Sequence, residues 1–149
     1  MLKFLVSSYF LLILGITQSY KTMNTKSFLL SGIAGTIVYF LLGWLFYGVL
    51  FLDIYPHEQS MLFIFLGCLF YAFTFALIFN RWAHISTFGS GLKAGFLIGL
   101  LWALSMNFFM QASSTVGIDT NFVIQLAIDA VSAAIMGGMI AAVIGKTKT

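Results

Sequence analysis

Four long apolar stretches, 28–52, 61–80, 92–111 and 122–144, take up most of this 149-residue chain. A helix needs about 20 consecutive apolar residues to cross the roughly 30 Å hydrocarbon layer of a membrane, and each stretch is that long. Charged residues make up only 7% of the chain and hydrophobic residues 61%, whereas soluble domains carry about 25% charged residues. Because so few polar groups cannot cover the apolar surface in water, we predict an all-α integral membrane four-helix bundle of two helical hairpins.

The basic residues lie on one side of the four predicted spans. Apart from Lys3, they occur before the first span, around the connection of the second to the third, and after the fourth: Lys21, Lys26, Arg81, Lys93, Lys146 and Lys148. In the other two connections the charged residues are all acidic: Asp53, Glu58 and Asp119. Since loops rich in Lys and Arg stay in the cytoplasm, we predict a multi-pass membrane protein with cytoplasmic N- and C-termini. The basic residues are dispersed rather than clustered, which argues against a nucleic-acid partner.

Residues 1–22 form an apolar extension ahead of the four-span membrane domain, 23–149. A cleaved signal peptide is disfavoured, because cleavage after Thr17-Gln18-Ser19 leaves Lys21 and Lys26 on the wrong side of the membrane. Two alternatives remain. Translation begins at Met23, or residues 2–19 form a short extra helix that spans the membrane or lies at its surface.

Small residues recur every fourth position on the last two predicted spans. The third span carries Gly91, Gly95, Gly99 and Ala103, and the fourth carries Ala130, Ala134, Gly138 and Ala142, flanked by Ala133, Gly137, Ala141 and Gly145. Small side chains permit the close backbone approach that holds helices together in lipid. We expect these two stripes to face each other within one chain; a homodimer seam is the alternative, and the sequence leaves both open.

Asp129 is the only formal charge well inside a predicted span, about eight residues, or roughly 12 Å at 1.5 Å per residue, from the outer end of its helix. An ionised carboxylate there costs on the order of 3 kcal/mol, so Asp129 is expected to face the bundle, to be protonated, or both. Gln125 is one turn further out on the same helix. Asn107 and Gln111 extend the glycine stripe of the third span outward, so antiparallel packing predicts an intramembrane polar cluster of all four. The tyrosines within spans, Tyr39, Tyr47 and Tyr71, are expected to find partners in that cluster or among backbone carbonyls.

Two interpretations of this cluster compete. As a hydrogen-bonded clasp it fixes the register of two helices, with each contact contributing about 0.6 to 2 kcal/mol. As a functional site it responds to protons or ions, because intramembrane carboxylates often mark conduction or coupling pathways. The clasp is favoured, since there is one acidic residue with no basic partner inside a span.

Three short motifs resemble a known family. They are Gly43-Trp44-Leu45-Phe46-Tyr47-Gly48 at the end of the first span, Gly95-Phe96-Leu97-Ile98-Gly99-Leu100 in the third, and Met136-Gly137-Gly138-Met139-Ile140 in the fourth. With the four-span length, the chain is similar over most of 28–145 to a family of small bacterial inner-membrane proteins classed as a domain of unknown function. The resemblance implies a four-helix domain of the bacterial cytoplasmic (inner) membrane with no assigned activity, and it carries over no functional residue.

The sequence predicts no catalytic, cofactor or metal site. It has no Ser-His-Asp arrangement, no His-Glu-x-x-His motif and no phosphate-binding loop, and His57, Glu58 and Asp53 in one loop are a weak metal signal. We therefore predict a non-enzymatic membrane component that packs with itself or with another membrane protein in the lipid bilayer. The alternative is a small transporter or proton-linked channel subunit that uses Asp129.

Overall fold

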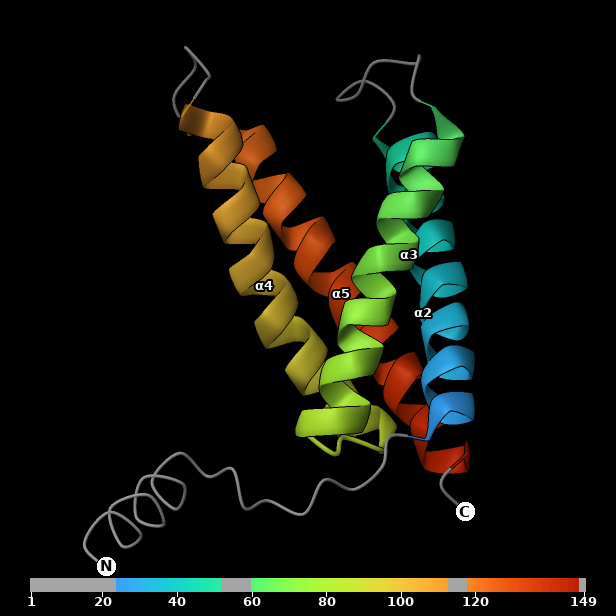
Figure 1. Ribbon diagram of the computed structural model, residues 1–149. Helices are drawn as coiled ribbons and strands as arrows, with labels where there is room; N and C mark the ends of the chain where they lie inside the picture. Colours follow the sequence, from blue (N-terminus) through green and yellow to red (C-terminus); the bar gives the residue numbers. More distant parts are fainter. Residues whose placement is uncertain (1–23, 52–59, 113–117, 148–149) are drawn as a thin grey trace, which may run out of the picture.

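The computed structural model describes residues 24–51, 60–112 and 118–147. Helix α2 (Thr25–Leu45) continues into the π-helical turn η1 (Phe46–Leu50), and α3 (Met61–Leu77) continues into the π-helical turn η2 (Ile78–Trp82). They are followed by α4 (Phe88–Ala112) and α5 (Thr120–Thr147) (Figure 1). The prediction of an all-α four-helix bundle is confirmed. The alternatives for residues 1–22, and the loop residues Asp53, His57 and Glu58, lie outside the described residues.

All four helices are long and apolar enough to cross a membrane: Thr25–Leu50, Met61–Trp82, Phe88–Ala112 and Thr120–Thr147. The predicted spans coincide with these helices. Most of the observed helices are longer by a few residues, because a helix satisfies its own backbone hydrogen bonds and continues past the apolar stretch until a capping or loop residue ends it.

Side-chain caps fix where three of the helices begin. The Asn24 side chain accepts a hydrogen bond from the Ser27 backbone N–H at 3.2 Å, ahead of α2. Thr87 Oγ1 accepts from the Ser90 N–H at 3.3 Å ahead of α4, and Asp119 Oδ1 accepts from the Phe122 N–H at 2.9 Å ahead of α5. Each cap satisfies one of the backbone donors that the first turn of a helix leaves free.

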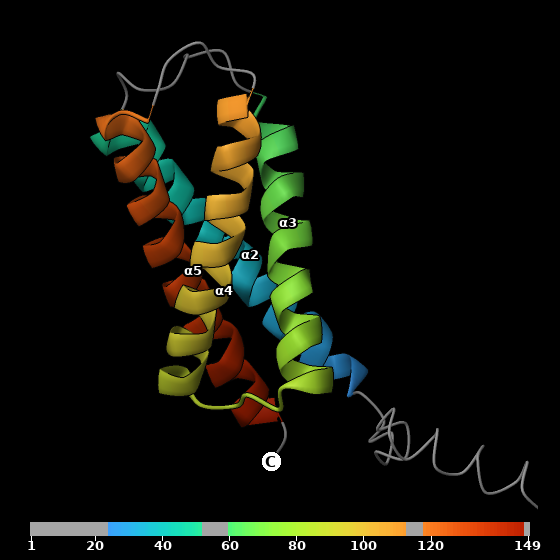
Figure 2. The same cartoon turned by 90° about the vertical axis from the view of Figure 1, so that its left-hand side faces the viewer.

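Helix α5 lies at the centre of the bundle. It packs along α4 and along α2, and α2 packs in turn on α3 (Figures 1 and 2). In the most apolar 18-residue stretch of α5, 61% of the residues are buried inside the protein, against 22–28% in the corresponding stretches of the other three helices. The outward faces of α2, α3 and α4 therefore form most of the apolar surface that lipid must cover.

The two hairpins meet most closely at one end of the bundle. At this end, called here the basic end, lie the start of α2, the end of η2, the start of α4 and the end of α5 (Figure 1). Thr147 Oγ1 of α5 donates to Ser27 Oγ of α2 at 2.7 Å and so joins the two hairpins. Within the first hairpin, Asn80 Nδ2 of η2 donates to the Asn24 carbonyl at 3.4 Å. Toward the opposite end, called here the far end, the two pairs of helices lean apart (Figure 1).

A core of apolar side chains joins α3 to α5. It consists of Ala72, Phe75, Ala76 and Phe79 with Ala133, Met136, Ile140, Ala141 and Ile144. Each of these residues is at most 1% exposed. The core lies mainly in the half of the bundle next to the basic end.

Candidate functional site around Asp129

The small residues of α4 form a tight seam with α5. Gly91, Gly95, Gly99 and Ala103 are all buried on one face of α4. A Cβ atom added at Gly95 meets the Ala133 carbonyl oxygen at 2.5 Å and the Gly137 Cα at 3.1 Å. The backbones of α4 and α5 therefore touch within one chain, as the first of the two alternatives for the stripes predicts.

On α5, the seam is centred one residue away from the predicted stripe. The row that faces the α4 glycines is Ala133, Gly137 and Ala141, which the sequence places only as flanking residues. Ala130, Ala134 and Gly138 are buried and Ala142 is half-buried, but Gly138 lies against the Phe88 ring at the start of α4. Because α5 carries small residues on two adjacent rows, the sequence alone does not show which row makes the backbone contact.

The other three residues of the predicted polar cluster make no hydrogen bond to Asp129 in the described part of the chain. Asn107 is 6% exposed, and its Nδ2 donates to the Ala103 carbonyl of its own helix at 2.8 Å. Gln111 and Gln125 are half-buried near the far end of α4 and α5. Among the described residues, the hydrogen-bond partner of Asp129 comes from another helix.

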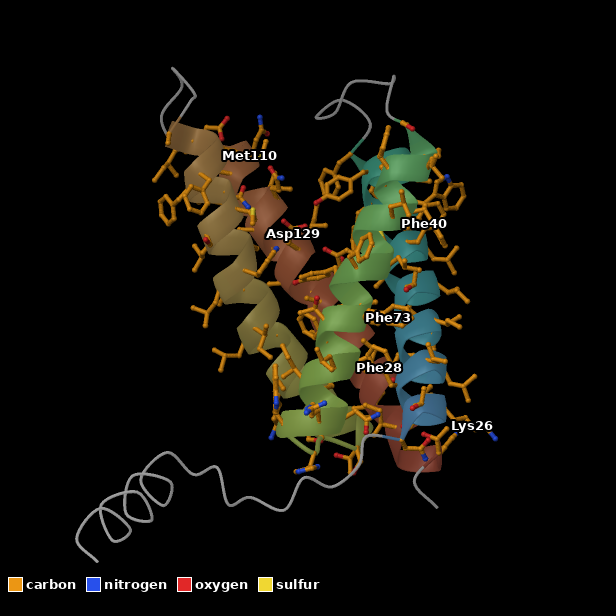
Figure 3. The ribbon with its side chains drawn as sticks, viewed as in Figure 1. Lys26, Phe28, Phe40, Phe73, Met110 and Asp129 are labelled. Atoms are coloured by element: carbon orange, nitrogen blue, oxygen red, sulfur yellow. The ribbon has the colours of Figure 1, made fainter. Side chains whose placement is uncertain are left out.

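That partner is Tyr47 in the π-helical turn η1. Its hydroxyl donates to Asp129 Oδ1 at 3.0 Å, so the bond joins the first hairpin to the second. Figure 3 shows Asp129 on the part of α5 nearer the far end, on the side toward the α2–α3 hairpin. The expectation that the tyrosines within spans find polar partners is confirmed for Tyr47.

The turn η1 gives Tyr47 its position at the end of the first span. The Phe46 N–H donates to both the Leu42 and the Gly43 carbonyl. The Phe51 N–H donates to the Phe46 carbonyl, five residues earlier, at 2.8 Å, which is the hydrogen bond of a π-helix. A π-helical turn adds a residue to one turn and so rotates the side chains that follow it. The apolar sequence of 46–50 contains no pattern that predicts this turn.

Two more tyrosines and a tryptophan surround this region. The Tyr39 ring of α2 and the Tyr71 ring of α3 have centroids 5.0 Å apart, and the Trp102 ring of α4 lies 6.0 Å from Tyr71. The Asp129 carboxylate is close enough to act electrostatically on the Tyr39 and Tyr71 hydroxyls. The sequence contained a partial signal, because the hydroxyl groups of tyrosines within spans need polar partners in lipid.

Within the described residues, no group of three or more His, Cys, Asp and Glu side chains lies close enough to hold a metal ion. Cys68 is buried in α3 as a free thiol. The site contains one carboxyl group, phenol hydroxyls and aromatic rings, and it lies between helices of both hairpins.

These helices and their arrangement define a multi-pass α-helical membrane protein whose surroundings are a lipid bilayer. A scan against protein-family models, a search of curated proteins and a search of solved structures each return no significant match.

Proposed function

We propose that this protein is a non-enzymatic component of the bacterial cytoplasmic membrane that packs with itself or with another membrane protein. The observation that carries the proposal is the hydrogen bond from Tyr47 to Asp129. The one carboxyl group inside the described spans is used to hold one hairpin against the other, which is a structural role. This is the clasp interpretation with a different partner, since it ties α5 to η1 instead of α5 to α4.

Removing the hydroxyl of Tyr47 tests the clasp. We expect Tyr47→Phe to lower the free energy of unfolding in micelles by about 1 kcal/mol, the size of an interhelical hydrogen bond in a membrane protein. Asp129→Asn keeps an acceptor oxygen, so it should leave folding intact, whereas Asp129→Ala removes the acceptor and with Tyr47→Phe completes a double-mutant cycle. Tyr39→Phe, which removes a hydroxyl from the same helix, is the control and should change stability by less than about 0.5 kcal/mol. A coupling energy of zero between positions 47 and 129 contradicts the clasp.

A small transporter or proton-linked channel subunit is the second candidate, and one observation favours it. Asp129 is only half-buried, and it lies in the half of the bundle where the hairpins lean apart (Figures 1 and 3). Intramembrane carboxyl groups that face such a region often serve transport. Proton flux into dye-loaded proteoliposomes separates the candidates. Flux that Asp129→Asn abolishes in a folded protein contradicts the non-enzymatic component, whereas wild-type flux equal to that of empty vesicles contradicts the transporter.

We also propose that both termini are cytoplasmic and that the chain belongs to the family of small inner-membrane proteins it resembles. Support for the orientation comes from Lys26, Arg81, Lys93 and Lys146, which all lie toward the basic end, while Asp119 lies at the far end. In a background with Cys68→Ser, we expect Ala83→Cys to resist a membrane-impermeant maleimide in intact cells and Ser60→Cys to react. The reverse pattern contradicts the proposed orientation, and reaction at both positions contradicts the antiparallel arrangement of the spans.

A further inference from the structure

Ser132 of α5 is a buried hydroxyl group with no hydrogen-bond partner among the described residues. It is 4% exposed, and its Oγ contacts neither another polar side chain nor a carbonyl in hydrogen-bond geometry. The other three buried hydroxyl residues are all paired. Ser31 donates to the Phe28 carbonyl at 3.1 Å, Thr36 donates to the Gly32 carbonyl at 2.8 Å, and Ser27 accepts from Thr147. An unpaired hydroxyl away from water is unfavourable, so the exception at Ser132 points to a missing partner.

Ser132 lies next to Asp129. The two residues are three positions apart on α5, which makes their side chains neighbours on the helix surface. This side of α5 faces α2, because Tyr47 bonds Asp129 and the Ile140 side chain packs on Gly35. Tyr47 uses Oδ1 of Asp129, and no hydrogen bond to Oδ2 is present within the described ranges. One carboxylate oxygen and one hydroxyl oxygen, three residues apart on α5, therefore lack a hydrogen-bond partner among the described residues.

The chemistry of this pair selects a ligand. Its atoms are oxygens, which bind hard cations. The basic side chains of the described residues are all toward the basic end, so none neutralises Asp129 within the bundle. A single carboxylate balances one positive charge, whereas a divalent ion leaves a net charge in an apolar surrounding, which is costly.

We propose that Asp129 and Ser132 bind one alkali-metal cation between α5 and α2. The cation pairs with Oδ2 of Asp129 and is held in place by Ser132 Oγ, while Tyr47 continues to hold Oδ1. Binding does not depend on the proposed function, because a cation at this position is compatible with a static membrane component and with a transporter. The proposed cation site predicts that particular cations stabilise the folded protein, which a hydrogen-bonded clasp alone does not.

The test is the thermal unfolding of the full chain in nanodiscs, in chloride salts of lithium, sodium, potassium and choline at constant ionic strength. We expect the midpoint to rise, in a saturable manner, with at least one alkali cation relative to choline, because a ligand that binds only the folded state stabilises it. Radioactive-cation binding by equilibrium dialysis is expected to give one ion per chain. Asp129→Asn should abolish both effects, and Ser132→Ala should weaken the apparent affinity roughly ten- to a hundredfold, as loss of a group that supports a bound ion does.

Ser31→Ala is the matched control. It removes another fully buried serine hydroxyl, but one that is paired within its own helix, so the cation affinity should stay unchanged. Equal midpoints in all four salts overturn the proposal, because no alkali cation then binds the folded chain selectively. Cation-specific stabilisation that persists in Asp129→Asn, or full affinity in Ser132→Ala, also overturns it, because the ion is then bound elsewhere. If Asp129→Asn fails to fold, the affinity of Ser132→Ala still decides the question.

Discussion

Gly95→Ala is expected to destabilise the protein by at least about 2 kcal/mol, although alanine is the better helix former. In an open helical position the same change gains up to about 1 kcal/mol of helix propensity. At Gly95 the added Cβ lies 2.5 Å from the Ala133 carbonyl oxygen and 3.1 Å from the Gly137 Cα. These are backbone atoms that no side-chain rotation can move aside, so α4 and α5 must separate and lose dispersion contacts along the whole seam. Unfolding in mixed micelles with increasing SDS, followed by circular dichroism, measures the change.

Gly67→Ala provides the matched control for this substitution. Gly67 lies inside α3, is exposed, and has no atom within 4 Å of an added Cβ. We expect it to leave stability unchanged or to raise it by up to about 1 kcal/mol, since only helix propensity acts there. If Gly95→Ala proves as harmless as Gly67→Ala, the two helices do not touch through their backbones.

The positions of the spans follow from the sequence because the bilayer imposes one strong constraint. A stretch of 20 or so apolar residues must form a helix to satisfy its backbone hydrogen bonds in lipid, and 28–52, 61–80, 92–111 and 122–144 each satisfy it. The α4 side of the seam can also be predicted from the sequence, because small residues recur every fourth position in a single row on that helix: Gly91, Gly95, Gly99 and Ala103. On α5 the choice between adjacent rows depends on how the helix is rotated against α2, α3 and α4 at once, which local spacing does not specify.

The hydrogen bond from Tyr47 to Asp129 shows why the site was less predictable than the fold. Asp129 was expected to meet Asn107 and Gln111 on the neighbouring helix α4, but Asn107 satisfies its amide through the Ala103 carbonyl. The Ala133, Gly137 and Ala141 row of α5 packs on the α4 glycines, whereas the Asp129 carboxyl group accepts its hydrogen bond from Tyr47 of η1. The π-helical turn then sets the direction of Tyr47. Both facts depend on helix rotation and local winding, whereas composition and periodicity report mainly on which residues avoid water.

Phe75→Ala is expected to cost about 3 kcal/mol, the second large effect. The Phe75 side chain is 1% exposed. Its ring packs edge-on against the rings of Tyr71 and Phe79, with centroid distances of 5.0 Å and 5.7 Å. Truncation leaves a cavity between α3 and α5, and Phe→Ala changes in packed cores cost about 3–5 kcal/mol. The lower end applies here, because lipid surrounds the unfolded helices with an apolar medium and removes the transfer contribution that water supplies. Chemical unfolding in micelles, with helix content as the signal, measures the loss.

Phe70→Ala on the same helix separates packing from hydrophobicity. Phe70 is 68% exposed on the outward face of α3, where lipid replaces the missing ring at little cost. We therefore expect less than about 0.5 kcal/mol of destabilisation, within the range of ordinary surface changes. Both substitutions remove the same apolar group from the same helix, so any difference between them reports dispersion contacts inside the bundle. Equal costs for Phe70→Ala and Phe75→Ala contradict the packing of α3 on α5, since neither ring is then inside a core.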